Sequence, residues 1–209
     1  MKLLKSLLLG FFIWSMGARF ATAEPIKIVA FGDSLMASYQ IEPSLGFPAQ
    51  LKKALAAKDV DVEMTDAAVS GDTTSGGLGR LDWSVPDGTQ IVILELGAND
   101  MLRGLPPEQA EANLNAMIGK LKARNIRVIL AGMRAAPNMG KAYENAFNGM
   151  FPRLARKHRL PLIPFFLKGV AGVPELQLED RMHPNPKGVK KMVENAMPVI
   201  LRAVTEPSQ

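Results

Sequence analysis

The sequence predicts an α/β protein, a three-layer α/β/α sandwich around a five-stranded parallel sheet. Five short aliphatic runs follow one another, and segments with helical periodicity separate them; this alternation is typical of a parallel sheet covered by helices on both faces. The chain has 209 residues, of which 47% are hydrophobic and 22% charged, enough for one core and a single domain. The expected strands are residues 26–31, 60–64, 91–96, 126–131 and 160–163.

Residues 1–23 have the three parts of a secretory signal. Lysines come first, followed by an apolar run too short to span a bilayer and by Ala21-Thr22-Ala23 as an Ala-x-Ala exit. We therefore expect cleavage after Ala23, a mature domain over residues 24–209, and a periplasmic or secreted protein. An uncleaved N-terminal anchor is the alternative, because Arg19 lies close to the cleavage site.

Charge and cysteine content narrow the choice of partners and chemistry. The expected signal carries Lys2, Lys5 and Arg19 and no acidic residue, so its removal lowers the net charge by three, from +5 to +2. This balance gives little reason to expect a nucleic-acid partner, and we expect a monomer without stable membrane insertion. The absence of cysteine excludes disulfides, a cysteine nucleophile and thiolate metal sites.

Four helical faces follow from apolar residues spaced three and four apart. Pro106-Pro107 opens the second helix, and Pro152 should kink or interrupt the third. Asn185 is the expected N-cap of the last helix, with Pro186 at its first position. The faces span residues 47–55, 110–121, 143–154 and 189–200.

The first strand runs directly into Gly32-Asp33-Ser34-Leu35. An aliphatic strand that ends in glycine and a small hydroxyl residue is one way to bring a nucleophile into a cleft, so Ser34 is the candidate nucleophile. A turn with a helix cap is the alternative for this motif alone. Met36 stands where the second glycine of Gly-x-Ser-x-Gly would be, which disfavours an ordinary α/β-hydrolase elbow.

Two further loops follow the second and third strands and contain Gly71 and Asn99. If the strand order is 2-1-3-4-5, both loops lie beside the serine loop at the carboxyl edge of the sheet. The backbone amides of Ser34 and Gly71 and the side-chain amide of Asn99 could then surround one oxygen, as an oxyanion hole requires. Ordinary turn chemistry is the alternative for either loop taken alone.

A serine nucleophile needs a base, and the chain has two histidines. His158 ends a basic helix face and is expected on the exposed surface. His183 precedes Pro184, which biases it away from helical geometry, so that Asp180 can share its turn and hold its imidazole N–H. Two histidines are few for a catalytic metal centre, and we expect neither a metal nor another cofactor.

Four sequence blocks, taken in order, resemble those of the SGNH hydrolases, also called the GDSL esterase/lipase superfamily. Within it the chain is similar to the exported bacterial thioesterase I/lysophospholipase (arylesterase) type. The resemblance implies the SGNH-hydrolase fold with its flavodoxin-like strand order, Ser34 as nucleophile, Gly71 and Asn99 as oxyanion donors, and His183 and Asp180 as base and orienting acid. The blocks are Gly32-Asp33-Ser34-Leu35, Gly71, Gly97-Ala98-Asn99-Asp100 and Asp180-Arg181-Met182-His183.

These observations together predict a serine esterase that hydrolyses carboxylic esters or thioesters (aryl esters, acyl thioesters or lysophospholipids) through an acyl-serine intermediate. Met101, Leu102 and Leu105 after the third strand, and Phe166 after the fifth, are the candidates for binding the acyl chain, with burial in the core as the alternative. A carbohydrate O-deacetylase on the same fold and a non-catalytic envelope binding protein are the other functions considered.

Overall fold

The computed structural model describes residues 24–206, and the expected signal peptide lies outside them. Five parallel strands form one sheet in the order β2-β1-β3-β4-β5, which confirms the prediction. The strands are β1 (Ile26–Phe31), β2 (Val62–Asp66), β3 (Ile91–Glu95), β4 (Arg127–Ala131) and β5 (Leu162–Ile163).

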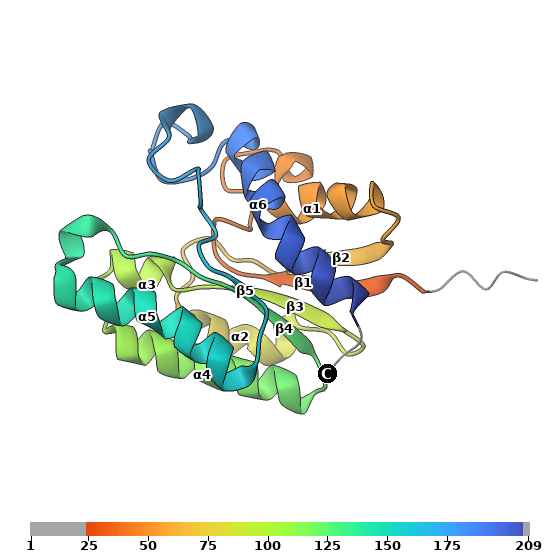
Figure 1. The fold of residues 1–209 in the computed structure, drawn as a ribbon, viewed down its shortest axis with the longest axis horizontal. Coiled ribbons are helices and arrows are strands. Elements are labelled where there is room, and N and C mark those ends of the chain that lie inside the picture. Colours follow the sequence, from red (N-terminus) through yellow and green to blue (C-terminus); the bar gives the residue numbers. More distant parts are fainter. Residues whose placement is uncertain (1–23, 207–209) are drawn as a thin grey trace, which may run out of the picture.

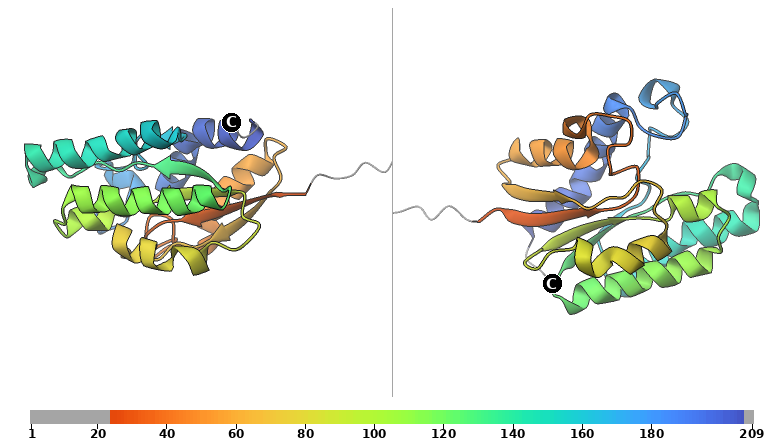
Figure 2. Two further views of the ribbon diagram at one scale, coloured as in Figure 1. Left: turned by 90° about the horizontal axis from the view of Figure 1, so that it is seen from below. Right: turned by 180° about the vertical axis from the view of Figure 1, so that it is seen from behind.

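Helices cover both faces of the sheet. They are α1 (Phe47–Ala56), α2 (Thr74–Ser84), α3 (Ala98–Leu102), α4 (Pro107–Ala123), α5 (Lys141–His158) and α6 (Pro186–Thr205). Helices α1 and α6 lie on one face and α2, α4 and α5 on the other, which gives the expected three layers (Figures 1 and 2). No helix within residues 24–206 is both long and apolar enough to cross a membrane.

Strand β1 lies between β2 and β3, so later strands are added on both sides of it. It pairs in parallel with β2 on one side and with β3 on the other. The loops that leave β1, β2 and β3 therefore emerge side by side at the carboxyl edge, which is where open parallel sheets place their sites.

Burial on both faces explains why the central strands are continuously apolar. All five residues of β3 are buried, and so is the second half of β1. Helix α1 packs over the sheet through Phe47, whose ring meets that of Phe166 edge to face at a centroid distance of 4.7 Å. Each such side chain contributes about 1.5–3 kcal/mol through its removal from water.

Helix α2 was not among the expected helices, because glycines at positions 76, 77 and 79 weaken a helical pattern. The Thr73 hydroxyl caps it by accepting from the Gly76 N–H. A Cβ atom on Gly77 would lie 2.3 Å from Leu96 Cδ1, so glycine permits the close approach of this helix to the sheet. Gly77 is therefore required for the packing contact between α2 and Leu96.

The other helix ends largely follow the sequence. Asn185 accepts from the N–H groups of Lys187 and Gly188, and Pro186 starts α6 as predicted. Helix α5 runs without interruption through Pro152, so that residue does not divide it.

Candidate active site

A serine, a histidine and an aspartate meet at the carboxyl edge of the sheet. Ser34 Oγ lies 2.9 Å from Nε2 of His183, and Nδ1 of the same imidazole lies 2.6 Å from Asp180 Oδ2. Ser34 is only partly buried, so its hydroxyl group can be reached from solvent. A hydroxyl, an imidazole and a carboxylate in this order can transfer the serine proton to the histidine while the aspartate holds the imidazole.

The turn that carries His183 is held locally. Asp180 Oδ1 accepts the backbone N–H groups of Met182 (2.9 Å) and His183 (3.0 Å), as the spacing predicts. Partial burial opposes ionisation of Asp180, but these N–H groups and the imidazole lower its pKa to about 2. Asp180 therefore stays ionised at any pH near neutrality, as an orienting carboxylate must.

Hydrogen bonds from Gln177 and Leu178 also hold the turn that carries His183. The Gln177 side chain donates to the Arg181 carbonyl at 2.8 Å, and the Leu178 N–H donates to the His183 carbonyl at 2.8 Å. Arg181 has φ of 57°, a left-handed conformation that such a bracing can maintain. The position of the imidazole is therefore set by backbone contacts on both sides of it.

The three loops that leave β1, β2 and β3 are joined in pairs. The Val69 N–H donates to the Gly32 carbonyl at 3.0 Å, which joins the second loop to the first. Asn99 Nδ2 donates to Asp33 Oδ2 at 3.0 Å and joins the third to the first. Arg103 donates to the Gly71 carbonyl at 2.7 Å and joins the third to the second.

These contacts bring the predicted oxyanion donors into the serine loop's neighbourhood. Gly71 has φ of 82°, a conformation that favours glycine. The Asn99 amide nitrogen carries two hydrogens, and the bond to Asp33 uses one of them. The bond to Asp33 therefore leaves the second hydrogen of this nitrogen unused.

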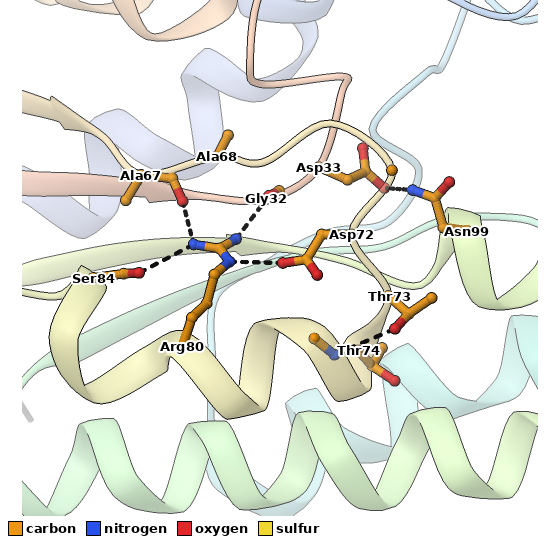
Figure 3. A network of polar contacts seen from close by, with 12 residues as sticks. Gly32, Asp33, Ala67, Ala68, Asp72, Thr73, Thr74, Arg80, Ser84 and Asn99 are labelled. Carbon is orange, nitrogen blue, oxygen red and sulfur yellow. Dashed lines mark hydrogen bonds and ion pairs between the residues drawn. The ribbon is translucent and has the colours of Figure 1, made fainter.

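A buried arginine fixes the second loop to the first (Figure 3). Arg80 of α2 donates to the carbonyls of Ala67 (2.6 Å) and Gly32 (3.0 Å) and pairs with Asp72 at 2.6 Å. The two charged side chains are only 8% and 11% exposed. The Arg80 guanidinium also lies 3.9 Å from the centroid of the Phe31 ring. One side chain thus joins the second loop to the loop that carries the serine.

Tyr39 also contacts the catalytic candidates. Its ring centroid lies 4.2 Å from that of His183, with the two planes tilted by 32°. Tyr39 also lines a small hollow beside Ser34, together with Ile41, Phe47 and Val189.

The residues predicted to bind an acyl chain are not gathered in this hollow. Phe166 is 1% exposed and packs against Phe47 in the core, and Met101 is also buried. Leu105 is half-buried, and its carbonyl accepts from a tyrosine hydroxyl. Leu102 alone is strongly exposed, at 57%. Burial in the core, the alternative kept for these positions, describes Phe166 and Met101.

The carboxylates near the site are engaged in protein contacts. Asp72 pairs with Arg80, and Asp100 accepts from both the N–H and the hydroxyl of Thr74. Within residues 24–206 no group of three or more histidines and carboxylates could hold a metal ion.

The second histidine lies elsewhere. His158 ends α5 and is half-buried, where the sequence suggested an exposed surface position, because its ring approaches Asn115 Oδ1 of the neighbouring α4 at 2.8 Å. Burial, followed by the charges of Lys157 and Lys122, lowers the pKa of His158.

Four residues that support the site were not singled out from the sequence: Tyr39, Arg80, Glu95 and Arg103. Arg80 gave no signal in the sequence, because its burial depends on packing. Glu95 interrupts an aliphatic strand, and a charged residue inside a buried strand could have indicated a special role.

A parallel α/β/α fold with a serine–histidine–aspartate arrangement at its carboxyl edge defines a hydrolase of the serine type. Residues 30–191 match the model of the GDSL-like Lipase/Acylhydrolase family, and the chain belongs to that family. It is therefore an esterase-type hydrolase of the SGNH group.

Named relatives agree with this assignment. The chain is 40% identical over 165 residues to the arylesterase of Vibrio mimicus, covering 77% of this chain and 81% of the relative. It is 35% identical over 167 residues to thioesterase 1/protease 1/lysophospholipase L1 of Escherichia coli K12, covering 79% of each. The crystal structure of TesA superimposes with a TM-score of 0.80 at 36% identity, covering 85% of this chain and 99% of that one.

Proposed function

We propose that the protein hydrolyses aryl esters, acyl thioesters and lysophospholipids through an acyl-serine intermediate. The observation that carries this proposal is the continuous chain of contacts from Ser34 Oγ through His183 to Asp180, at 2.9 and 2.6 Å. Such distances lie within hydrogen-bond reach, as a nucleophile and its base require.

In the proposed reaction His183 takes the Ser34 proton as Oγ attacks the substrate carbonyl. Asp180, ionised and fixed by two backbone N–H groups, stabilises the imidazolium that forms. The amides of Ser34 and Gly71 and the side chain of Asn99 receive the negative charge that develops on the carbonyl oxygen. His183 then protonates the leaving group and activates the water that releases the acyl chain.

The proposed acyl substrates have apolar groups, and apolar side chains are exposed next to the site. Val69, Leu102 and Met182 are 46%, 57% and 49% exposed, and each lies within three residues of a proposed catalytic or oxyanion residue. Exposed apolar groups on three loops around one serine favour a medium or long acyl chain or an aryl ring over acetate alone. The names of the two curated relatives support the same range of esters and thioesters.

The proposed location is outside the cytoplasm, after removal of residues 1–23. Support comes from the sequence pattern that ends in Ala21-Thr22-Ala23. N-terminal sequencing of the exported protein should begin at Glu24, and a protein that begins at Met1 would contradict cleavage.

The direct test is hydrolysis of p-nitrophenyl esters from acetate to palmitate by residues 24–209, with Ser34→Ala as the comparison. We expect a maximum at chains of intermediate length and loss of turnover in Ser34→Ala. Wild-type protein should also be labelled at Ser34 by a phosphonate ester, which needs no particular acyl chain.

Two results would contradict the proposal. Turnover that survives Ser34→Ala would exclude the serine mechanism. A profile that peaks at acetate and falls steeply, with labelling at Ser34 intact, would keep the mechanism but replace the substrate class by the acetyl esters of a carbohydrate deacetylase.

A further inference from the structure

Two carboxyl groups lie side by side beneath the serine loop, and the proposed reaction uses neither. Asp33 and Glu95 are 0% and 1% exposed. The Asp33 N–H donates to Glu95 Oε2 at 3.3 Å, and a Cβ atom on Gly32 would lie 2.8 Å from the same oxygen. Glycine at position 32 therefore leaves space for the Glu95 carboxyl group against the backbone of the loop.

Among residues 24–206, no basic side chain compensates the pair. Within residues 24–206 no ion pair involves Asp33 or Glu95, and Arg80 from α2 is bound to Asp72 and to backbone carbonyls instead. His183, from the loop before α6, is the titratable group that favours the charge on Asp33. Two adjacent buried carboxylates without a counter-ion do not both ionise, so one of them retains a proton.

Hydrogen bonds decide which of the two keeps the proton. Asp33 accepts at both oxygens, from the Leu35 N–H at Oδ1 and from Asn99 Nδ2 at Oδ2, each at 3.0 Å. In the described part of the chain, Glu95 accepts only the long contact at Oε2, and its buried Oε1 has no partner. The negative charge is therefore better stabilised on Asp33, and the proton belongs to Glu95.

The pKa directions agree with this placement. Burial raises the pKa of Asp33 to about 6, against the opposing hydrogen bonds from Leu35 and Asn99 and the charge of His183. Burial and then the charge of Asp33 raise the pKa of Glu95 well above its usual range. Near neutral pH Asp33 is thus the ionised member of the pair and Glu95 the neutral one.

We propose that Glu95 is a neutral carboxylic acid whose O–H supports the Asp33 carboxylate, and that this carboxylate in turn positions the Asn99 amide for the oxyanion hole. An ionised Asp33 can only accept, so it selects the amide nitrogen of Asn99 over the amide oxygen. A protonated Asp33 would lose this selection, and Nδ2 would no longer be held in place. Glu95 is therefore a positioning residue, and the inference rests on the proposed role of Asn99.

The experiment compares two substitutions of Glu95 with a matched control. Glu95→Gln keeps a neutral donor of the same length, whereas Glu95→Leu keeps the volume without a donor. Glu63→Gln on β2 is the control, because Glu63 is exposed. Infrared spectra at neutral pH detect the C=O stretch of a protonated carboxylic acid, which is separate from that of carboxylates. Steady-state kinetics on the best p-nitrophenyl ester give kcat and KM for each protein.

We expect an acid C=O band in wild-type protein and in Glu63→Gln that is missing from Glu95→Gln. We also expect Glu95→Gln to keep kcat within about threefold of wild type, and Glu95→Leu to lower it on the order of tenfold or more at little-changed KM, because a misplaced oxyanion donor acts on the transition state.

The proposal is overturned if no acid band in the wild type depends on Glu95, since the proton would then lie elsewhere. It is also overturned if Glu95→Leu turns over at the wild-type rate, or if Glu95→Gln loses as much kcat as Glu95→Leu. The infrared measurement needs no turnover, so its result stands whether or not the proposed esterase reaction is observed. An inactive wild type would contradict the proposed function alone.

Discussion

The buried arginine at the junction of the loops gives the sharpest quantitative prediction. Arg80→Met removes the partner of Asp72, which is only 11% exposed, and removes donors to the carbonyls of Gly32 and Ala67. Breaking a buried pair by deleting one member leaves an uncompensated charge and costs about 3–5 kcal/mol. The free energy of unfolding of Arg80→Met should therefore fall by this amount.

The exposed pair of Arg153 with Glu111 is the matched control. It has two contacts, at 2.6 and 3.0 Å, but its side chains are 47% and 27% exposed. Surface pairs of this kind contribute about 0–1 kcal/mol, so Arg153→Met should change stability little. The comparison separates burial from the mere presence of an ion pair.

The assay is urea unfolding of Arg80→Met, Asp72→Asn, the double variant and Arg153→Met. Neutralising Asp72 in the Arg80→Met background should recover about 1–3 kcal/mol, because it removes the orphaned charge. Arg80→Met should also lower kcat on the order of tenfold, since the loop that carries Gly71 loses its side-chain link to the serine loop and keeps only the backbone contact of Val69 with Gly32. A loss of stability no larger than that of Arg153→Met, or no recovery in the double variant, would refute the reasoning.

Three further predictions concern the site. Asn99→Ala should lower kcat about 10²- to 10³-fold without changing the far-UV circular dichroism spectrum, and full activity would remove Asn99 from the oxyanion hole. Asp180→Ala should lower kcat on the order of 10²- to 10⁴-fold, because His183 loses the acceptor 2.6 Å away. Steady-state kinetics at saturating ester would show this loss, and an unchanged kcat would contradict the orienting role. Burial and the charge of Asp33 raise the pKa of Glu95 above its usual value of 4.5. The folded protein therefore keeps a proton that the unfolded chain releases. The contribution of Glu95 to stability declines as pH rises above 4.5. The unfolding free energy of Glu95→Gln, measured in urea, should therefore increase relative to that of wild type between about pH 5 and pH 8. A difference between the two proteins that is independent of pH would argue against the raised pKa.

Local patterns in the sequence were enough for most of the fold. Strands buried on both faces are continuously apolar, and the segments between them repeat every three and four residues, so type and order of elements could be predicted. The Asp180–His183 contact could be predicted as well, because two residues three positions apart share one turn and their contact depends on no distant segment. Of the kink or interruption expected at Pro152, the interruption was wrong, since α5 is continuous from Lys141 to His158.

Helix α2 shows where local patterns fail. Its glycines weaken the helical pattern, but Gly77 is needed because the helix lies against Leu96 of the loop after β3. The packing distance between a helix and a sheet is a property of the assembled layers, and no local propensity contains it.

The sequence by itself determined the class of fold, the order of its elements and the residue types that can perform serine hydrolysis. Only the tertiary structure decided which side chains support them. Arg80 reaches Gly32 across 48 positions, and Glu95 reaches Asp33 across 62. Contacts of this kind depend on burial and on the register of neighbouring strands, which set both the partners of a charged group and its state of ionisation.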